Sequence, residues 1–280
     1  MYIIQTIING LLLGGVYALL GVGMTMIFGI VKLTNLAHGE FIVLGAYLSV
    51  VLAPMLGIDP VLTLFVSVPL MFLAGFLLQY FLIGKAMKKG NEPALLVTFG
   101  LSIILQDVML LIFSADAQHI NTSYAVASIR IGELEISVLN IVLFIISISA
   151  ITALSAFLKY THTGRAIRAT ADDTDAAALT GVSVKKVYAI AMGISMASAA
   201  LAGLCVGMKW TFYPSSGGSY LLIAFVVVVI GGLGSVPGTL IAGILFGMAQ
   251  VIGGANYGLL ISYIMLLIVL IVKPKGIFGK

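Results

Sequence analysis

The chain has 280 residues, of which 61% are hydrophobic and 9% are charged, and its formal net charge at pH 7 is +4. A soluble domain carries about 25% charged residues and could not bury this much apolar surface, so the composition excludes a water-soluble protein. The single cysteine, Cys205, excludes an internal disulfide, and the modest net charge gives no signal of nucleic-acid binding.

Apolar runs of about 20 residues, enough to cross a hydrocarbon core about 30 Å thick, recur along the whole chain. The first starts at once without the basic region of a signal peptide, so we expect it to be a retained helix. The sequence predicts an all-α, polytopic helical membrane protein, with about eight transmembrane segments in a single domain, 1–280. The runs are 3–31, 40–56, 61–84, 94–115, 138–158, 187–208, 220–252 and 258–272.

The distribution of lysine and arginine predicts which segments face the cytoplasm. Eleven of the fourteen basic residues lie in segments 85–93, 159–186 and the C-terminal tail 273–280, so we expect these to be cytoplasmic, the C-terminus included. The segments 57–60, 116–137 and 209–219 would then face outside. In the last of them, the aromatic residues are expected to form a belt at the membrane interface: Trp210, Phe212 and Tyr213.

Two polar or glycine-rich stretches interrupt the apolar pattern, FGIVKLTNLAHGE at 28–40 and IGGLGSVPGT at 230–239. The flanking pieces can be too short to cross alone, which predicts two broken or re-entrant helices beside a substrate path. Half-helices that dip in and return would put the N-terminus on the cytoplasmic side, with the C-terminus. A conventional crossing by 3–31 would put it outside; we favour the cytoplasmic side.

The first interruption contains polar side chains that serve two interpretations. Thr34 or Asn35 would cap the helix that starts here, and Glu40 would complement the positive end of its dipole. Alternatively, Asn35, His38 and Glu40 line an aqueous pathway, because a carboxyl group in hydrocarbon normally faces protein or water. The two roles are compatible.

The second interruption combines glycines, which permit tight turns, with a proline suited to the first turn of a new helix. We predict a re-entrant turn here, with Ser235 as a further pathway candidate. The turn residues are Gly231, Gly232, Gly234, Pro237 and Gly238. The sequence contains no G-x-x-x-x-G-K-[ST] loop, so the chain is not expected to hydrolyse ATP. Catalytic and metal-binding patterns are also missing, and we expect no catalytic residue, metal or cofactor.

Polar residues also occur inside apolar runs: Gln106 and Asp107 in 94–115, and Gln250 in 240–252. Such residues either bond to neighbouring helices or line a pathway, and the sequence leaves both open. The pairs Gly10–Gly14 and Gly243–Gly247 have the four-residue spacing that permits close helix packing.

The segment 159–186 is the longest one predicted to be cytoplasmic. Its alanine-rich composition predicts a short helix that ends near Gly181. It is either a solvated connector or a docking element for a partner's groove. The candidate residues are Gly164, Arg165, Arg168, Asp172, Asp175 and Gly181.

Four stretches together resemble a known family. YALLGVGMTMIFGIVKLTNLAHGEFIVLGAYL at 17–48 is similar to the N-terminal signature of branched-chain amino-acid ABC transporter permeases, closest to the smaller, H-type subunit. TGRAIRATADDTDAAALTGVSVKKVYAIAMGIS at 163–195, VIGGLGSVPGTLIAGILFGMAQ at 229–250 and the ending IVKPKGIFGK also resemble that family. The resemblance extends over essentially the whole chain.

The resemblance implies a multi-pass permease of the cell inner membrane, embedded in the lipid bilayer. Its partners would be a second homologous permease subunit, two cytoplasmic ATPase subunits that hydrolyse ATP, and an extracytoplasmic solute-binding protein. The segment 163–181 would be the coupling helix that docks on an ATPase. The small polar solute would be leucine, isoleucine or valine, with urea or a short-chain amide as the alternative. An ion-coupled secondary transporter or a passive channel remains a different class of explanation.

Overall fold

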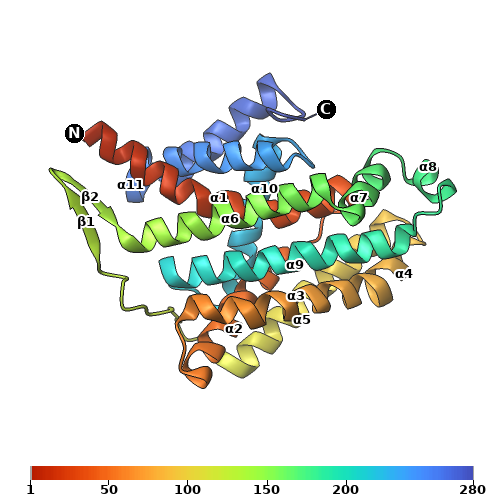
Figure 1. The fold of residues 1–280 in the computed structure, drawn as a ribbon, viewed down its shortest axis with the longest axis horizontal. Helices are drawn as coiled ribbons and strands as arrows, with labels where there is room; N and C mark the ends of the chain where they lie inside the picture. Colours follow the sequence, from red (N-terminus) through yellow and green to blue (C-terminus); the bar gives the residue numbers. More distant parts are fainter. Residues whose placement is uncertain (1, 280) are drawn as a thin grey trace.

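The computed structural model describes residues 2–279. Within them, eight helical spans are long and apolar enough to cross a membrane, which confirms the all-α, polytopic prediction. The spans contain α1 (Tyr2–Val31), α2 (His38–Leu56), α3 (Leu64–Leu78) continued by the π-helical turn η2 (Gln79–Ile83) and α4 (Gly84–Met87), α5 (Asn91–Phe113), α6 (Val138–Tyr160), α9 (Val184–Lys209), α10 (Gly217–Gly231) and α11 (Val236–Val272). Most run along the long axis of the molecule, and α10 crosses them in Figure 1.

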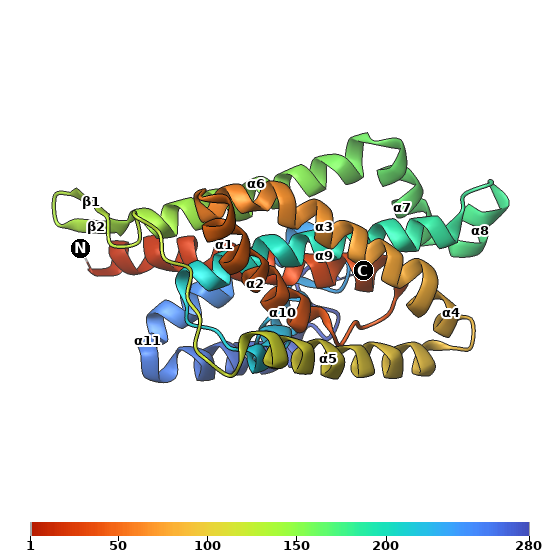
Figure 2. The ribbon, with the colours of Figure 1, turned by 90° about the horizontal axis from the view of Figure 1, so that it is seen from below.

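Two short helices and a β-hairpin lie at opposite ends of the bundle (Figures 1 and 2). The helices are α7 (His162–Asp172) and α8 (Thr174–Leu179), and the hairpin pairs β1 (Ser128–Ile131) with β2 (Leu134–Ser137) in antiparallel register. The sequence did not predict the hairpin. The 3₁₀ turns η1 (Pro60–Thr63) and η3 (Pro214–Ser216) precede α3 and α10.

Helices α1 and α9 form the centre of the bundle, and their side chains are mostly buried. Helices α3, α5 and α6 lie around them and expose large apolar side chains such as Phe65 and Leu111. Such an apolar surface is stable only in contact with lipid or with another apolar subunit. The fold therefore agrees with a chain embedded in a bilayer.

The two predicted glycine pairs meet each other where α1 packs against α11. A side chain at Gly14 would come within 2.5 Å of the Cα of Ile244, and one at Gly10 within 2.9 Å of the Cα of Met248. Gly243 and Gly247 approach the α1 backbone equally closely. The four glycines thus let two membrane helices pack backbone to backbone, as their spacing predicted.

Replacing Gly14 with valine is expected to separate α1 from α11 and to destabilise the folded protein. Overpacking a well-packed core costs about 1–3 kcal/mol, and here the obstructing atoms are backbone atoms that cannot rotate away. The measurement is the thermal unfolding midpoint of the detergent-solubilised protein. Gly100→Val is the matched control, because a side chain at Gly100 in α5 meets no atom within 4 Å; equal losses in both variants would contradict this packing.

Helix α1 crosses the bundle completely, and the expectation that the N-terminus shares a side with the C-terminus is wrong. Its 30 residues span about 45 Å at 1.5 Å per residue. Near its start, Gln5 Oε1 accepts from the backbone N–H of Glu135 in the β-hairpin (3.2 Å). Near its end, Gly29 contacts Gly234 beside the C-terminal tail. The two chain termini therefore lie at opposite ends of α1.

Both interruptions break the helices, but the second one differs from the expected arrangement. The predicted run 220–252 is split at 232–235, and the expected separate span 258–272 is instead the second part of α11, which bends at Gly254 (φ 61°). The turn 232–235 lies at the inner end of α1, next to the tail. The stretch that enters the bundle from the outer side is 210–216, since Gly217 at the start of α10 touches Glu40.

The aromatic residues after α9 do not form the expected interface belt. Phe212 is fully buried, with its backbone paired to Gln118 and its ring packed edge-on against Tyr47 (5.0 Å). Trp210 stacks on Tyr17 inside the bundle (5.9 Å), and only Tyr213 is largely exposed. The chain turns into the bundle here to begin α10, and the rings of Trp210 and Phe212 therefore lie inside the bundle.

Candidate functional site

The stretch 32–37 returns from the end of α1 into the bundle, where α2 begins. Asn35 shapes this turn: its Oδ1 accepts from the backbone N–H of Ala37 (3.1 Å), and its carbonyl accepts from the N–H of His38 (3.2 Å). The N-cap residue of α2 is Ala37, which makes no side-chain capping bond. The interpretation of Thr34 or Asn35 as the cap of α2 is therefore wrong, because Asn35 lies two residues before Ala37 and its side chain closes the preceding turn instead.

His38 and Glu40 lie inside the bundle with unsatisfied polar atoms. His38 is 1% exposed, and its Nε2 lies 3.3 Å from the carbonyl oxygen of Leu20 in α1. Glu40 is 6% exposed. Neither His38 Nδ1 nor Glu40 Oε2 has a hydrogen-bond partner within residues 2–279, and the same holds for the nearby Ser195 Oγ. Buried polar atoms without partners are rare in native proteins and indicate a site that water or a ligand completes.

The first turns of α2 and α10 meet at this polar cluster, which consists of His38, Glu40 and Ser195. Gly39 packs against the carbonyl oxygen of Gly217, and the Glu40 carboxyl group lies against Gly217 itself. Two helix N-termini, each a positive dipole end with free backbone N–H groups, thus approach one acidic side chain. An anionic group is favoured at such a position, and the Glu40 carboxyl group occupies it.

An aromatic pocket of about 300 Å³ lies beside the polar cluster. Tyr17, Trp210 and Tyr220 line it together with Gln250 and Leu20. Leu20 connects the two sites, because it lines the pocket and its carbonyl oxygen lies beside His38. The sequence predicted Gln250 as a pathway candidate, but two tyrosines in different helices and the tryptophan after α9 gave no signal of a common pocket.

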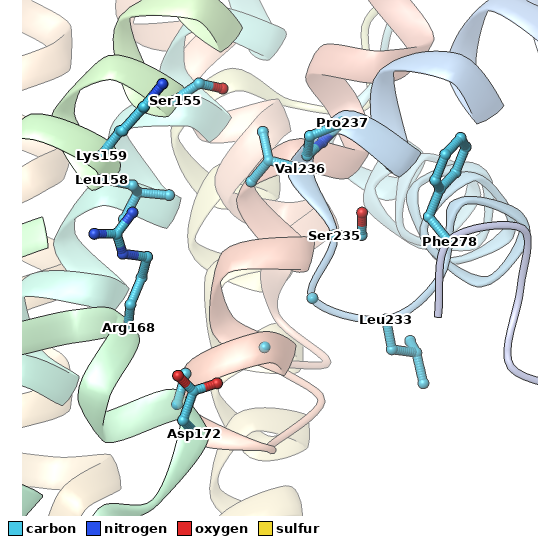
Figure 3. A pocket seen from close by; sticks show the side chains of 13 residues that line it. Ser155, Leu158, Lys159, Arg168, Asp172, Leu233, Ser235, Val236, Pro237 and Phe278 are labelled. Carbon is cyan, nitrogen blue, oxygen red and sulfur yellow. The ribbon is translucent and has the colours of Figure 1, made fainter. Parts of the chain in front are cut away.

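A second cavity, of about 500 Å³, joins the predicted coupling segment to the second interruption. In Figure 3, Arg168 and Asp172 from α7 lie across it from Ser235 and Pro237, with Phe278 of the tail at its edge. Two groups of residues that are more than 60 positions apart in the sequence thus share one cavity.

Ser235 and the tail hold the turn 232–235 in place. The Ser235 hydroxyl accepts from the N–H of Gly238 (3.1 Å), so Ser235 caps α11, with Pro237 in its first turn as predicted. The backbone of Ile277 donates to the carbonyl of Ile230 (2.9 Å), and Phe278 donates to Gly231 (3.2 Å). Gly232 and Gly234 have φ of 97° and 84°, values that favour glycine.

The predicted coupling segment forms two helices rather than one. Asp173 ends α7 and caps α8, because its carboxylate accepts from the N–H groups of Asp175 and Ala176. Gly164 packs against the end of α6, so a side chain there would overlap the backbone of Phe157 and Leu158. The chain leaves α8 at Gly181 (φ 86°), where the sequence placed the helix end.

Helix α8 protrudes beyond the bundle (Figure 1). Leu179 at its end is 90% exposed, and Asp175 is also exposed. On α7, Arg165 lies 2.9 Å from His162 Nδ1. The role of this segment as a docking element for a partner remains a prediction.

Two pathway candidates lie apart from these sites. Gln106 and Asp107 are on the peripheral helix α5, where Asp107 is exposed and Gln106 is half-buried. The polar cluster and the aromatic pocket do not include them. Their assignment to the pathway remains a prediction.

Comparison with known proteins gives consistent matches along the chain. A family model described as the permease component of the branched-chain amino acid transport system matches residues 6–272. LivH of Escherichia coli (strain K12), a high-affinity branched-chain amino acid transport system permease protein, is 33% identical over 100% of this chain and 96% of its own. BraD of Pseudomonas aeruginosa, described in the same words, is 30% identical over 99% and 96%.

A relative with a different named substrate also matches. RbsC of Haemophilus influenzae, a ribose import permease protein, is 30% identical over 87% of this chain and 76% of its own. No solved structure matches this chain.

Proposed function

The chain belongs to the branched-chain amino acid transport permease family, and on that premise we propose that it is the membrane subunit of an ATP-driven importer of leucine, isoleucine and valine. The named function of LivH and BraD, which match over nearly their whole length, supports this substrate class. The polar cluster and aromatic pocket offer groups for both ends of such a solute. The Glu40 carboxyl group suits its ammonium group, and aromatic side chains suit its aliphatic part.

We propose that the energy for import comes from partner subunits. These are two cytoplasmic ATPases, a second homologous permease and an extracytoplasmic solute-binding protein that delivers the solute. The observation that carries the proposal is the cavity between α7 and the turn 232–235. A displacement of α7 by an ATPase would reach α10 and α11 through that turn, and α10 begins at Gly217, which touches Glu40. An element that can take two positions is what alternating access requires.

The orientation of the chain follows from the same proposal. The end with α7 and α8 faces the cytoplasm, together with the C-terminal tail and the lysines of 85–93. The N-terminus and the β-hairpin face outside, and the segments 116–137 and 209–219 receive the binding protein. A cysteine-accessibility experiment with Ser128→Cys and Leu179→Cys in intact cells checks the assignment, because only the first should react with an impermeant thiol reagent.

The experiment that tests the function is uptake by proteoliposomes that contain this chain, its partner permease, the ATPases and the binding protein. We expect accumulation of leucine that requires both ATP and the binding protein. Accumulation of ribose, urea or a short-chain amide instead would support an ATP-driven importer but contradict the proposed substrate class. Leucine flux through this chain alone, without ATPases, would reject the importer in favour of a secondary transporter or channel.

Reversing the charge of Arg165 or Arg168 is expected to impair coupling to the ATPases without preventing membrane insertion. Both side chains are exposed on α7, so the fold does not depend on them, and a reversed charge at a docking surface typically costs 1–3 kcal/mol, or about 5- to 150-fold in affinity. The measurement is co-purification of the ATPases together with ATP-driven uptake. Arg130→Glu on the outer β-hairpin is the control for ATPase binding; normal uptake in both α7 variants would refute this docking face.

A further inference from the structure

A pocket at the predicted cytoplasmic end of the bundle is unrelated to the sites described above. It has a volume of about 450 Å³ and lies between the end of the α3–η2–α4 span and the beginning of α9. Three lysines line it, Lys85, Lys88 and Lys185, and its lining contains no aspartate or glutamate. The pocket is therefore strongly electropositive and has no counter-charge of its own.

One of the three lysines, Lys185, is held at the pocket by an aromatic ring. The ammonium group of Lys185 lies 3.5 Å from the centre of the Tyr80 ring, a cation–π contact that fixes a side chain which would otherwise be free in solvent. Tyr80 belongs to the π-helical turn η2, which interrupts the regular α-helix. Turns of this kind within helices occur frequently at functional sites.

Gln79 adds an independent observation that indicates a ligand. Its side chain lines the pocket and is 1% exposed. The amide nitrogen donates to the sulfur of Met87 (3.3 Å), while Oε1 has no hydrogen-bond partner within residues 2–279. A buried acceptor without a donor in the chain indicates that water or a ligand with an O–H or N–H group completes it.

The surroundings of the pocket identify the kind of molecule. Leu77, Phe81 and Leu82, on the same span, expose their apolar side chains and therefore face acyl chains in a bilayer. Lys85 and Lys88 follow at the end of this span, and Lys185 lies at the start of α9; basic residues at the ends of membrane helices are expected near the lipid phosphates. Basic pockets between helices on the cytoplasmic side are suited to anionic headgroups. A free phosphate ion would make no use of the adjoining apolar surface.

We propose that this pocket binds the headgroup of an anionic phospholipid of the inner leaflet that carries a hydroxyl group, as phosphatidylglycerol does. The phosphate lies among Lys85, Lys88 and Lys185, and a headgroup hydroxyl donates to Gln79 Oε1. The bound lipid ties α4 to the start of α9, a few residues after α8. This site does not depend on the transported solute or on the transport function.

The test measures binding of phosphatidylglycerol to the full-length protein in detergent, by native mass spectrometry and by the shift in thermal unfolding midpoint. The pocket variant is Lys88→Gln/Lys185→Gln. Its control, Lys89→Gln/Lys186→Gln, removes the same charge from two immediate neighbours that do not line the pocket. We expect the pocket variant to bind about tenfold or more weakly, and the control to bind like the original chain.

A second variant isolates the headgroup hydroxyl. Gln79→Met keeps the volume and removes the acceptor, so the preference for phosphatidylglycerol over phosphatidic acid, which has no headgroup hydroxyl, should disappear. Equal losses in the pocket and control variants would overturn the proposal in favour of diffuse charge attraction. So would competition by soluble glycerol phosphate as strong as by the lipid. Unchanged lipid binding combined with lost co-purification of ATPases in the pocket variant would assign the pocket to a protein partner instead.

Discussion

Replacing Leu179 with aspartate is expected to abolish ATP-driven uptake while leaving the permease folded. Leu179 is 90% exposed at the end of α8, which protrudes from the bundle, so the substitution removes little contact within the chain. If α8 docks in an ATPase groove, the leucine is desolvated there, and an unpaired carboxylate in its place costs at least about 2–3 kcal/mol. That corresponds to roughly 30- to 150-fold weaker docking.

The measurement is co-purification of the ATPases with the permease, followed by uptake and ATP hydrolysis in proteoliposomes. Leu179→Met retains the apolar volume and should behave like the original chain. Val126→Asp provides a charge of the same kind at a residue that is 95% exposed on the opposite end of the bundle. Undiminished ATPase binding by Leu179→Asp, or an equal loss of ATPase binding with Val126→Asp, would show that α8 is not the docking element.

The hydropathy pattern and the glycine spacing predicted the fold because both properties act locally along a helix. The first six apolar runs predicted their spans to within a few residues, whereas 220–252 and 258–272 are divided differently in α10 and α11. The spacing of Gly10–Gly14 and of Gly243–Gly247 predicted close helix packing, and the two pairs meet where α1 contacts α11. The polar break before Glu40 marked the point where the chain enters the bundle. An acidic side chain in an apolar run must face protein or water and not lipid.

The path of the chain between spans could not be predicted in the same way. The side on which the N-terminus lies depends on whether the residues up to Val31 cross the membrane as one helix. A stretch of 30 apolar residues can form either one full crossing or two shorter half-helices. In a membrane protein, lipid-facing and buried helix faces are equally apolar, so no periodicity marks the inward side. Phe212 was for this reason assigned to the interface although it is buried.

The aromatic pocket and the exposed position of Leu179 also depend on tertiary structure, so they could not be predicted from the sequence. Tyr17 and Tyr220 are more than 200 residues apart and occur in no motif. The division of the coupling segment into α7 and α8 depended on the Asp173 carboxylate turning back to cap α8. Three aspartates lie within four positions, Asp172, Asp173 and Asp175, and the sequence does not indicate which of them caps the helix.

Replacing Gly39 with alanine is expected to disrupt the meeting point of α2 and α10 and with it both stability and transport. A methyl group at Gly39 would overlap the backbone carbonyl of Gly217. A backbone oxygen at the first turn of a buried helix cannot rotate away, so α10 would have to shift. In an unobstructed helix the change from glycine to alanine stabilises by about 1 kcal/mol, and overpacking costs about 1–3 kcal/mol or more.

The higher helix propensity of alanine stabilises the protein, whereas overpacking destabilises it. Gly218→Ala is the matched control, because it has the first effect without the second. A side chain at Gly218, the next residue of α10, meets no atom within 4 Å, so this variant should unfold at the same or a higher temperature and transport normally. Gly39→Ala should unfold at a lower temperature and lose uptake, because a shifted α10 also moves Gly217 away from Glu40. An unfolding midpoint of Gly39→Ala as high as that of Gly218→Ala would rule out the close approach of the two helices. A lower unfolding midpoint with normal uptake would show that the contact between α2 and α10 stabilises the protein but is not needed for solute transport.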